Sequence, residues 1–387
     1  MPQTIAVLGA GTMGSGIAQV AATYNHNVIL YEPHKEVLDY SRKNLTRILN
    51  RQVEKERMTN EQVNGILDRL ASVTDLKYIK QADVVIEAII EDAEIKKDLY
   101  EEAEPLVSDD AIIATNTSSL SVASLTGAFK KPERFLGIHF FNPAPLMPLV
   151  EIVPSVLTKE DITDTARKLI DSWDKTTVLA KDLPGFIVNR IARPFYGEAL
   201  RILEEGIADV ATIDKAMKEE GGFRMGPFEL MDFIGNDVNQ KVSETVFESF
   251  YYDPRYRPSL TQKRMAEAGL LGRKSEKGFY DYREGAEKPA ATEDEELSRQ
   301  IADRIITMLI NQAAEACWLN VASKEEIDLA MTKGVNYPKG LLAWADELGA
   351  KEIVNRMDAY YDYYREDRYR CCPLLRDMAA SGKKFFG

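Results

Sequence analysis

Residues 7–19 read VLGAGTMGSGIAQ, in which Gly9, Gly11 and Gly14 form the pattern G-x-G-x-x-G. A strand-like apolar run precedes the first glycine, and a segment of helical periodicity follows the third. In that context the first glycine permits a tight turn, the second lets a pyrophosphate approach the backbone, and the third allows close helix–strand packing. Glycine triplets also occur in ordinary turns. Here a helix N-terminus would face the phosphates, so the stretch predicts a dinucleotide site in an α/β domain.

An acidic residue follows the glycine-rich loop at the distance that a nucleotide site requires. Glu32 ends the strand-like run NVILYE (27–32), eighteen residues after Gly14. A carboxylate there can accept hydrogen bonds from both ribose hydroxyls and would repel a 2′-phosphate. The alternative is a solvated strand end without a ligand. Given the glycines upstream, we expect NAD rather than NADP, held by Glu32 and by the loop residues Gly9, Ala10, Gly11, Thr12, Met13 and Gly14.

The first 183 residues alternate between strand-like and helix-like segments. Helical periodicity separates short runs rich in Val and Ile, as buried strands are. The long polar interval from Glu36 to Leu76 has room for two helices. This alternation predicts an α/β fold with a doubly wound, mostly parallel sheet, a Rossmann-type domain over residues 1–183. The expected strands are 4–9, 27–32, 82–89, 111–116 and 134–141.

Beyond Asp182 the chain becomes helical. Pro184-Gly185 interrupts the chain, and residues 186–206 begin a region without strand-like runs. The stretch REGAEKPAATEDEE (283–296) is polar and acidic, which is typical of a linker. We therefore expect an all-α domain over 184–282, a linker over 283–298 and a second all-α domain over 299–387.

The two helical segments repeat one another. IDKAM (213–217) returns as IDLAM (327–331), an offset of 114 residues. FRMGPFELMDFIG (223–235) returns at the same offset as YPKGLLAWADELG (337–349), and the dipeptide YR recurs at an offset of 113. A shared offset across three patches indicates an internal duplication. A repeated helical unit can bury its apolar face against its copy.

Composition limits the partners and the location of the chain. The net charge of −13 over 387 residues argues against nucleic acid or an anionic membrane as a general partner. No apolar run approaches the roughly 18 residues that a membrane helix needs, and the N-terminus lacks the features of a secretory signal. The three cysteines show no metal spacing, and the adjacent pair Cys371–Cys372 is expected to be reduced. We expect a cytoplasmic protein without a metal.

A rare histidine and a carboxylate in a strand-like run suggest acid–base chemistry. His139 is one of three histidines, and Glu151 lies twelve residues later between Val150 and Ile152. A neutral imidazole can take the proton of an alcohol during hydride transfer, and a buried carboxylate can fix its tautomer. Three prolines in the connector favour two runs lying side by side. The alternative is a core histidine bound to a backbone carbonyl, with Glu151 pointing outward.

Two neighbouring features favour the catalytic interpretation. TNTSS (115–119) ends a predicted strand in small hydrogen-bonding side chains, at the sheet edge where ligands bind in this architecture. Asn142 follows His139 by three residues. TNTSS also suits an ordinary helix N-cap, and both interpretations can hold together.

Six segments resemble, in order and spacing, the L-3-hydroxyacyl-CoA dehydrogenases, which include bacterial 3-hydroxybutyryl-CoA dehydrogenases. The likeness covers residues 1 to about 282, and the segments read GAGTMGSGIAQ, VVIEAIIED, TNTSSL, GIHFFNPAPLMPLVEIV, DLPGFIVNRI and MGPFELMDFIG. Among these segments, the motifs HFFNP and GFIVNR are highly specific for this family. The resemblance implies that His139 is the general base and Glu151 its orienting partner. It also implies that Ser118 contacts the substrate 3-oxygen and that Asn189 polarises the same end of the substrate.

The resemblance also implies cofactor and coenzyme contacts. Asn142 would lie beside the nicotinamide, and other NAD contacts would fall on Gly9, Gly11, Gly14, Glu32, Glu91, Lys96, Asn116, Ser118 and Lys274. Without the resemblance, Lys96 and Lys274 would pass as solvated surface lysines. For coenzyme A, the family pattern maps onto Asn44 and Arg51 in place of the usual Ser and Lys, with Ser118 as a further contact.

A basic helix face offers a place for the CoA phosphates on an acidic protein. Residues 42–57 hold six basic and two acidic residues, and Arg47, Arg51 and Lys55 recur every four residues on one stripe. Leu45, Ile48, Leu49 and Val53 would line the opposing apolar face. The alternative is a solvated face whose cations pair with Glu54 and Glu56.

The resemblance implies an NAD-dependent oxidation of a short-chain (S)-3-hydroxyacyl-CoA, such as 3-hydroxybutyryl-CoA, in fatty acid β-oxidation or butanoate metabolism, or the reverse reduction. One alternative is an NAD-linked dehydrogenase of a free 3-hydroxy acid of the gulonate type; the related hydroxyisobutyrate type uses a catalytic lysine where this chain has His139 and Glu151. A second alternative is a nucleotide-binding scaffold without activity.

The second helical copy raises the question of association. In short single-copy relatives two chains dimerise through this domain, and the longer multifunctional β-oxidation proteins resemble the tandem arrangement. The copy at 299–387 has no sequence like GFIVNR or GRKSEKGFY, so it is expected to have lost the active-site side and to cover the first copy. We therefore expect either a homodimer or a monomer in which the second copy replaces the dimer partner.

Overall fold

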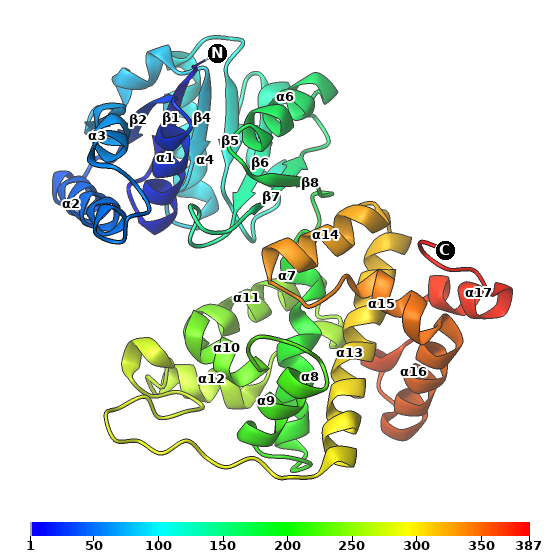
Figure 1. Ribbon diagram of the computed structural model, residues 1–387. Coiled ribbons are helices and arrows are strands. Elements are labelled where there is room, and N and C mark those ends of the chain that lie inside the picture. Colours follow the sequence, from blue (N-terminus) through cyan, green and yellow to red (C-terminus); the bar gives the residue numbers. More distant parts are fainter. Residues whose placement is uncertain (1) are drawn as a thin grey trace. The chain divides into compact units, whose positions relative to one another are not determined.

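The computed structural model describes residues 2–387, and the chain divides into two compact units, 1–183 and 184–387 (Figure 1). The first unit contains all eight strands of the described chain in one sheet, and the second is helical. This division agrees with the change of sequence character near Pro184.

The first unit is a twisted sheet covered by helices. Its elements are β1 (Thr4–Leu8), α1 (Thr12–Thr23), β2 (Asn27–Tyr31), α2 (Lys35–Glu54), α3 (Asn60–Asp68), β3 (Leu70–Val73), β4 (Val84–Glu87), α4 (Ala93–Ala103), β5 (Ile112–Thr115), α5 (Val122–Leu125), β6 (Phe135–Phe140), β7 (Leu149–Pro154), α6 (Glu160–Asp171) and β8 (Thr176–Leu179). The strand order is β3-β2-β1-β4-β5-β6-β7-β8, and only the β6–β7 pair is antiparallel. The prediction of a doubly wound, mostly parallel sheet is confirmed.

The five predicted strands, the strand-like run around Glu151 (β7) and the two predicted helices of the polar interval are present, but two strands were missed. β3 lies inside the interval that was assigned to helices alone, and β8 follows α6. Both are four-residue strands at the two edges of the sheet. Short edge strands carry few buried apolar residues, so their sequences, LASV and TTVL, lack the continuous apolar run of a central strand.

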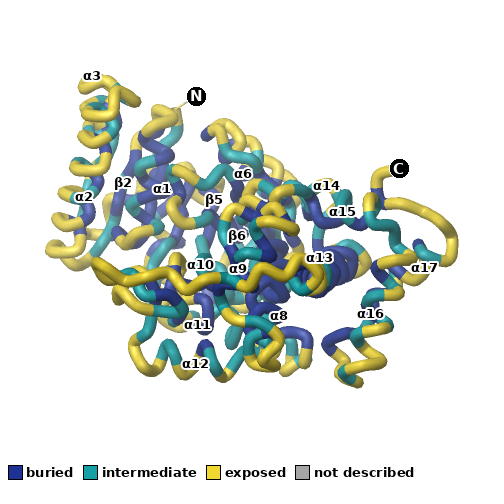
Figure 2. Tube along the Cα trace, turned by 60° about the horizontal axis from the view of Figure 1, so that its bottom comes forward, coloured by how far each residue is buried: buried dark blue, intermediate teal, exposed yellow. Residues whose placement is uncertain are grey.

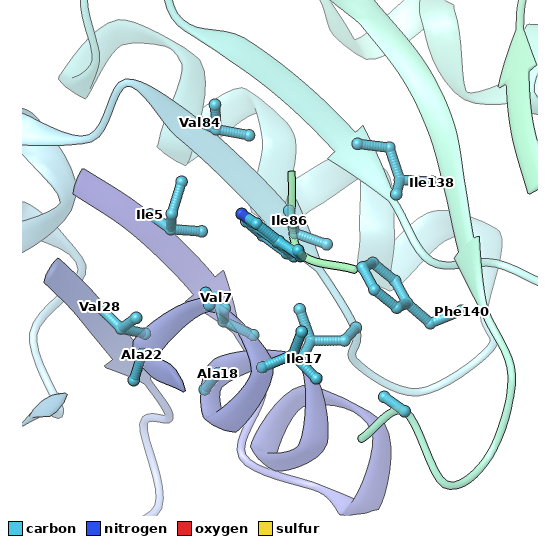
Figure 3. Close-up of a cluster of buried hydrophobic side chains, with 14 of the residues drawn as sticks. Ile5, Val7, Ile17, Ala18, Ala22, Val28, Val84, Ile86, Ile138 and Phe140 are labelled. Carbon is cyan, nitrogen blue, oxygen red and sulfur yellow. The ribbon is translucent and has the colours of Figure 1, made fainter. Parts of the chain in front are cut away.

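The sheet and α1 share one apolar core. Figure 3 shows side chains of β1, β4 and β6 packed against Ile17 and Ala18 of α1. Trp173, which follows α6, is fully buried in the same cluster. Figure 2 shows burial concentrated in the strands and α1, whereas α2 carries a long exposed side. The core therefore fixes the strand ends that carry the polar residues considered below.

The second unit is a bundle of helices. Its elements are α7 (Val188–Ile191), α8 (Arg193–Glu204), α9 (Val210–Glu219), α10 (Pro227–Ile234), α11 (Asn236–Ser249), α12 (Leu260–Glu267), α13 (Glu295–Trp318), α14 (Lys324–Gly334), α15 (Leu341–Leu348), α16 (Ala350–Tyr364) and α17 (Pro373–Ser381). The helix α13 begins at Glu295, inside the stretch that was expected to be linker, because Asp294 caps it by accepting from the backbone of Leu297.

The duplication is visible in side-chain contacts. Asp214 on α9 accepts hydrogen bonds from the backbone N–H groups of Phe228 and Glu229 at the start of α10, at 2.8 and 2.9 Å. At an offset of 114, Asp328 on α14 accepts from Leu342 and Ala343 at the same two distances. In each copy a carboxylate thus caps the next helix, which requires a glycine beside it: a Cβ on Gly226 or Gly340 would lie 2.3 or 2.2 Å from that carboxylate.

The second copy keeps segments at the positions equivalent to GFIVNR and to the end of GRKSEKGFY, although their sequences differ. At an offset of 114, residues 300–305 (QIADRI) on α13 stand where FIVNRI (186–191) stands in the first copy. The C-terminal KKFFG donates two backbone hydrogen bonds to Asp346, at 2.7 and 2.8 Å. The backbone of GFY (278–280) donates to Asp232, the counterpart of Asp346, in the same way. The second copy keeps these segments in altered form.

Candidate active site

The glycine-rich loop has the shape that a dinucleotide needs. Gly9 has a φ of +102°, and a Cβ there would approach the carbonyl oxygen of Ala88 to 2.7 Å. Gly14 lies so close to the carbonyl oxygen of Gly9 that a Cβ would come within 1.9 Å of it. A Cβ on Gly11 would meet nothing within 4 Å. Gly11 also precedes α1 without a side-chain cap, so the space and the N–H groups of the first turn suit a pyrophosphate.

Glu32 closes this loop at the end of β2. One carboxylate oxygen accepts from the backbone N–H of Ala10 and the other from that of His34, both at 3.2 Å. The side chain is half-buried. A carboxylate oxygen has a second lone pair, so these bonds hold Glu32 in place and leave acceptor capacity for ribose hydroxyls. The loop and Glu32 therefore fit an NAD molecule. Of the other predicted loop contacts, Thr12 is exposed, Met13 is half-buried and Ala10 is buried.

His139 and Glu151 form the contact that the sequence suggested. They are directly opposite in the antiparallel β6–β7 register, which brings cross-strand side chains on one face together. Nδ1 of His139 lies 2.6 Å from a carboxylate oxygen of Glu151. His139 is 5% exposed and Glu151 is fully buried. The carboxylate acts as an acceptor, so Nδ1 carries the proton of the neutral ring and Nε2 keeps its lone pair.

The segment that connects β6 to β7 packs against α1, the helix that follows the glycine-rich loop. A Cβ on Gly16 of α1 would lie 3.2 Å from Ala144 and 3.3 Å from Pro145. Asn142 is exposed at the start of this connection. Lys175 holds it by donating to the carbonyl oxygens of Ala144 and Met147, at 2.6 and 2.8 Å. The strand ends of β1 and β6 thus share one edge of the sheet, as expected for a ligand site in this architecture.

The TNTSS segment is arranged around Glu91. One oxygen of Glu91 accepts from Thr117 Oγ1 at 2.5 Å and from the backbone N–H groups of Ser118 and Ser119 at 3.1 and 3.2 Å. The other oxygen lies 3.3 Å from Lys96 Nζ. Burial alone would raise the pKa of Glu91, but Lys96 and these hydrogen bonds outweigh it and hold the pKa below its usual value. Glu91 therefore fixes the backbone that carries Ser118, which is half-buried.

Asn116 has a structural contact of its own, because its side-chain oxygen accepts from the backbone N–H of Phe140 at 2.8 Å. That bond links the end of β5 to the end of β6, one residue from His139. Asn116 therefore joins the two strand ends that carry the candidate site.

Lys96 is not the solvated lysine that its charged surroundings indicated. It is 1% exposed on α4 and lies 2.5 Å from the fully buried Glu87, at the end of β4. Glu87 also accepts from Tyr100 at 2.5 Å and from Thr115 at 2.8 Å. Burial and the neighbouring Glu87 raise the pKa of Tyr100 well above its usual value, so it donates as a neutral phenol.

Sequence reasoning missed Glu87, although a signal was present. A carboxylate in the apolar run ADVVIEAI (82–89) is as unusual as Glu151 in its strand. Glu87 binds Lys96, and Lys96 binds Glu91, so an ion-pair chain runs from the buried Glu87 in the sheet to Glu91, which is partly exposed, at the TNTSS segment.

Arg47 and Arg51 of the predicted basic stripe lie on α2, and Lys55 is the residue that caps its C-terminus. Arg47, Arg51 and Lys55 are exposed, and none of them forms an ion pair with any residue that the structure describes. Arg47 is instead oriented by Asn44, whose side-chain oxygen accepts from it at 2.7 Å. The opposing face is apolar and buried at Leu45 and Leu49. Ile48 was assigned to that face wrongly, since it is 38% exposed.

Two predicted site residues belong to the helical unit. Asn189 is half-buried on α7, whose other three residues are buried. Lys274 follows α12 and lies 2.6 Å from Asp237. Burial raises the pKa of Asp237, but Lys274 outweighs this and the pKa is lowered.

The described residues hold no cluster of His, Cys, Asp and Glu that could bind a metal ion. Across residues 2–387, none of the helices has the length and apolar character needed to cross a bilayer. Cys317, Cys371 and Cys372 are free thiols, and burial raises the pKa of Cys371 to about 12 and that of Cys372 to about 11.

Comparisons with known proteins agree with this geometry. The family model described as 3-hydroxyacyl-CoA dehydrogenase, NAD binding domain, matches residues 4–183, and that described as 3-hydroxyacyl-CoA dehydrogenase, C-terminal domain, matches 185–282 and 301–384. The 3-hydroxyadipyl-CoA dehydrogenase of Escherichia coli is 36% identical, with 97% of each chain covered.

A solved structure is similar over the whole chain. The 3-hydroxybutyryl-CoA dehydrogenase of Escherichia coli has a TM-score of 0.91 at 35% identity, with 99% of each chain covered. The fatty acid oxidation complex subunit alpha of Acinetobacter baylyi is 35% identical over 99% of this chain, which spans 56% of that subunit's length.

Proposed function

Since the chain belongs to the 3-hydroxyacyl-CoA dehydrogenase family and is an NAD-dependent oxidoreductase, we propose that its substrate is a short-chain (S)-3-hydroxyacyl-CoA, with His139 as the general base. The reaction converts (S)-3-hydroxyacyl-CoA and NAD⁺ to 3-oxoacyl-CoA, NADH and a proton, or runs in reverse, as a step of fatty acid oxidation. The observation that supports it best is the 2.6 Å contact between His139 and Glu151 at the nucleotide edge of the sheet.

His139 takes the hydroxyl proton on Nε2 while Glu151 holds Nδ1–H and stabilises the imidazolium that forms. The glycine-rich loop and Glu32 would hold NAD⁺, which would supply the acceptor for the hydride from C3 of the substrate. Ser118 donates to the 3-oxygen from a backbone that Glu91 fixes. Asn189 polarises the same end of the substrate. In the reverse direction, protonated His139 supplies the proton.

The coenzyme A phosphates bind the stripe formed by Arg47, Arg51 and Lys55, with Asn44 beside it. Support comes from the exposure of the three cations and from their lack of ion pairs among the described residues. An anionic ligand on a protein of net charge −13 needs such a local basic surface. Arginine binds phosphate well, so Arg51 serves where the family usually has lysine.

The second helical copy takes the place of a dimer partner, and the enzyme acts in the cytoplasm. The matched contacts between the copies support the first statement. The three free cysteines, which suit a reducing compartment, support the second.

Initial rates test the proposed substrate. Acetoacetyl-CoA and longer 3-oxoacyl-CoA esters are offered with NADH and with NADPH, and free 3-oxo and 3-hydroxy acids serve as controls. We expect turnover of the short CoA ester with NADH and a large preference over NADPH, because Glu32 would repel a 2′-phosphate. Turnover of the free acids with none of the CoA esters would assign the chain to the gulonate type.

A further inference from the structure

The two helical copies meet through two matched clusters of charged residues. Gln312 on α13 donates to the Tyr256 hydroxyl at 2.7 Å, and Tyr369 donates to Glu198 on α8 at 3.0 Å. Positions 198 and 312, like 256 and 369, are equivalent under the repeat. Each copy therefore presents the same positions to the other, as the two halves of an isologous dimer interface do.

In the first cluster, Glu315 of the second copy serves two arginines of the first. Its carboxylate lies 3.4 Å from Nη2 of Arg190 and 2.5 Å from Nη1 of Arg255. Arg190 is 1% exposed, and Glu315 is the only carboxylate within ion-pair distance of it among the described residues. A guanidinium buried to this degree needs a counter-charge, and removal of that charge is strongly destabilising locally.

Arg190 belongs to the same short helix as Asn189. The helix α7 has four residues, barely one turn, so side-chain contacts rather than its own hydrogen bonds set its position. On one side, Arg193 donates to the carbonyl oxygen of Asn189 at 2.9 Å and to Ser243 at 3.1 Å. On the other side, Arg190 stacks over the ring of Phe250 at 4.9 Å.

We propose that Glu315 is a positioning residue for the reaction: through Arg190 it fixes α7 and thereby the orientation of Asn189. The second copy thus supports the substrate site of the first instead of only covering an apolar face. This inference rests on the proposed function of Asn189.

The repeat supplies a matched control in the second cluster. Glu205 lies 2.7 Å from Arg304 and 3.6 Å from Arg368, which are the counterparts of Arg190 and Arg255. Arg304 is adjacent to Asp303, which occupies the position of Asn189. Glu205 does not occupy the position of Glu315, and Arg304 also lies 3.0 Å from Glu198. Substitution of Glu205 therefore disturbs a related arginine–glutamate bridge beside a residue to which no role in the reaction is assigned.

The test compares Glu315→Gln with Glu205→Gln in the full-length chain. We expect both variants to have a lower Tm and an unchanged Kd for NADH. In Glu315→Gln, kcat with acetoacetyl-CoA should fall about tenfold, because small displacements of an orienting group are costly, whereas Glu205→Gln should stay within twofold of wild type. A kcat within twofold of wild type in Glu315→Gln, or an equal fall in both variants, overturns the proposal.

A double-mutant cycle gives a readout that a purely structural role would not produce. Arg190→Met removes the group through which Glu315 acts, so adding Glu315→Gln to it should leave kcat unchanged. A further loss of kcat in the double variant overturns the route through Arg190. This comparison of Arg190→Met with the double variant can be made even if Glu315→Gln alone fails to fold. An inactive wild-type chain, or an Asn189→Ala variant with full kcat, would instead remove the proposed function.

Discussion

His139 and Glu151 show how a charged residue in an apolar strand can be explained by its neighbour across the sheet. A fully buried carboxylate is costly unless a hydrogen-bond donor meets it. The imidazole N–H meets this one at 2.6 Å, and the direct register of β6 and β7 holds both groups in place. The pair is therefore preorganised before any substrate arrives.

Replacement of His139 tests its assignment as base. His139→Gln keeps a polar side chain of similar reach but cannot take up a proton, so kcat should fall at least ~10²-fold. We expect this fall in kcat together with an unchanged Kd for NADH, which fluorescence titration measures. Retention of more than about a tenth of wild-type kcat would contradict the role of general base, since that loss should exceed tenfold.

A second prediction concerns the contribution of Glu91 to stability and its dependence on pH. Its folded pKa is lowered, with Lys96 and the TNTSS donors outweighing burial, so it contributes stability above its unfolded pKa and loses it as the pH falls through the folded value. Wild type should therefore exceed Glu91→Gln in Tm at pH 6, and the gap should close as the pH falls below about 4.5. A gap that stays constant down to pH 3 would show that the ionised carboxylate does not stabilise this segment.

At this scale the sequence predicted the contact between His139 and Glu151 better than the residues that support it. His139 and Glu151 are conspicuous because both are rare in their surroundings. Glu87 was missed, and Lys96 would pass as a surface lysine without the resemblance, because a helix position and a strand position met only through the packing of α4 on the sheet. Their burial depends on tertiary contacts that no local pattern encodes.

At the scale of elements, the parallel strands were predictable and the edge strands were not. Central strands carry continuous apolar runs because both faces are covered. β3 and β8 each pair with one neighbour only, and their four-residue sequences were indistinguishable from helix and loop. The boundary of α13 was missed for a related reason, since acidic residues suit both a linker and the first turn of a helix.

The basic face of α2 carries a prediction of its own. Exchange of Arg47, Arg51 and Lys55 for Glu turns an attractive stripe into a repulsive one, so KM for acetoacetyl-CoA should rise by tenfold or more, about 1.4 kcal/mol at least. Initial rates at varied thioester concentration measure it. The matched control is Lys35→Glu, on the same helix but paired with Asp39, and Kd for NADH should be normal in both. An unchanged KM in the triple variant would place the coenzyme elsewhere.

At the scale of the whole chain, the internal repeat was detectable because the copies kept their spacing. The capping carboxylates Asp214 and Asp328 and the glycines beside them explain why these positions survived. QIADRI escaped notice as a counterpart of FIVNRI because only isoleucines and an arginine remain in common. Structural positions persist in a duplicate more readily than reactive ones.

The helical unit predicts the behaviour of a truncated chain. A fragment of residues 1–282 exposes the surfaces of α8 and Tyr256 that the second copy covers in the full chain. We expect this fragment to dimerise or aggregate, as judged by sedimentation velocity against the intact chain. Clean monomeric behaviour would mean that the second copy is not a substitute for a dimer partner.

The fusion of α8 and α13 into one polypeptide has a further consequence. Two separate subunits part when they are diluted, and their melting temperature depends on how much protein is present. Tethered halves meet at a fixed effective concentration, so no such dependence arises for this contact. Identical subunits must also accept every substitution on both sides of their interface. The two copies of a tandem gene change independently, so one copy can hold Asn where the other holds Asp, and Glu where the other holds Gln.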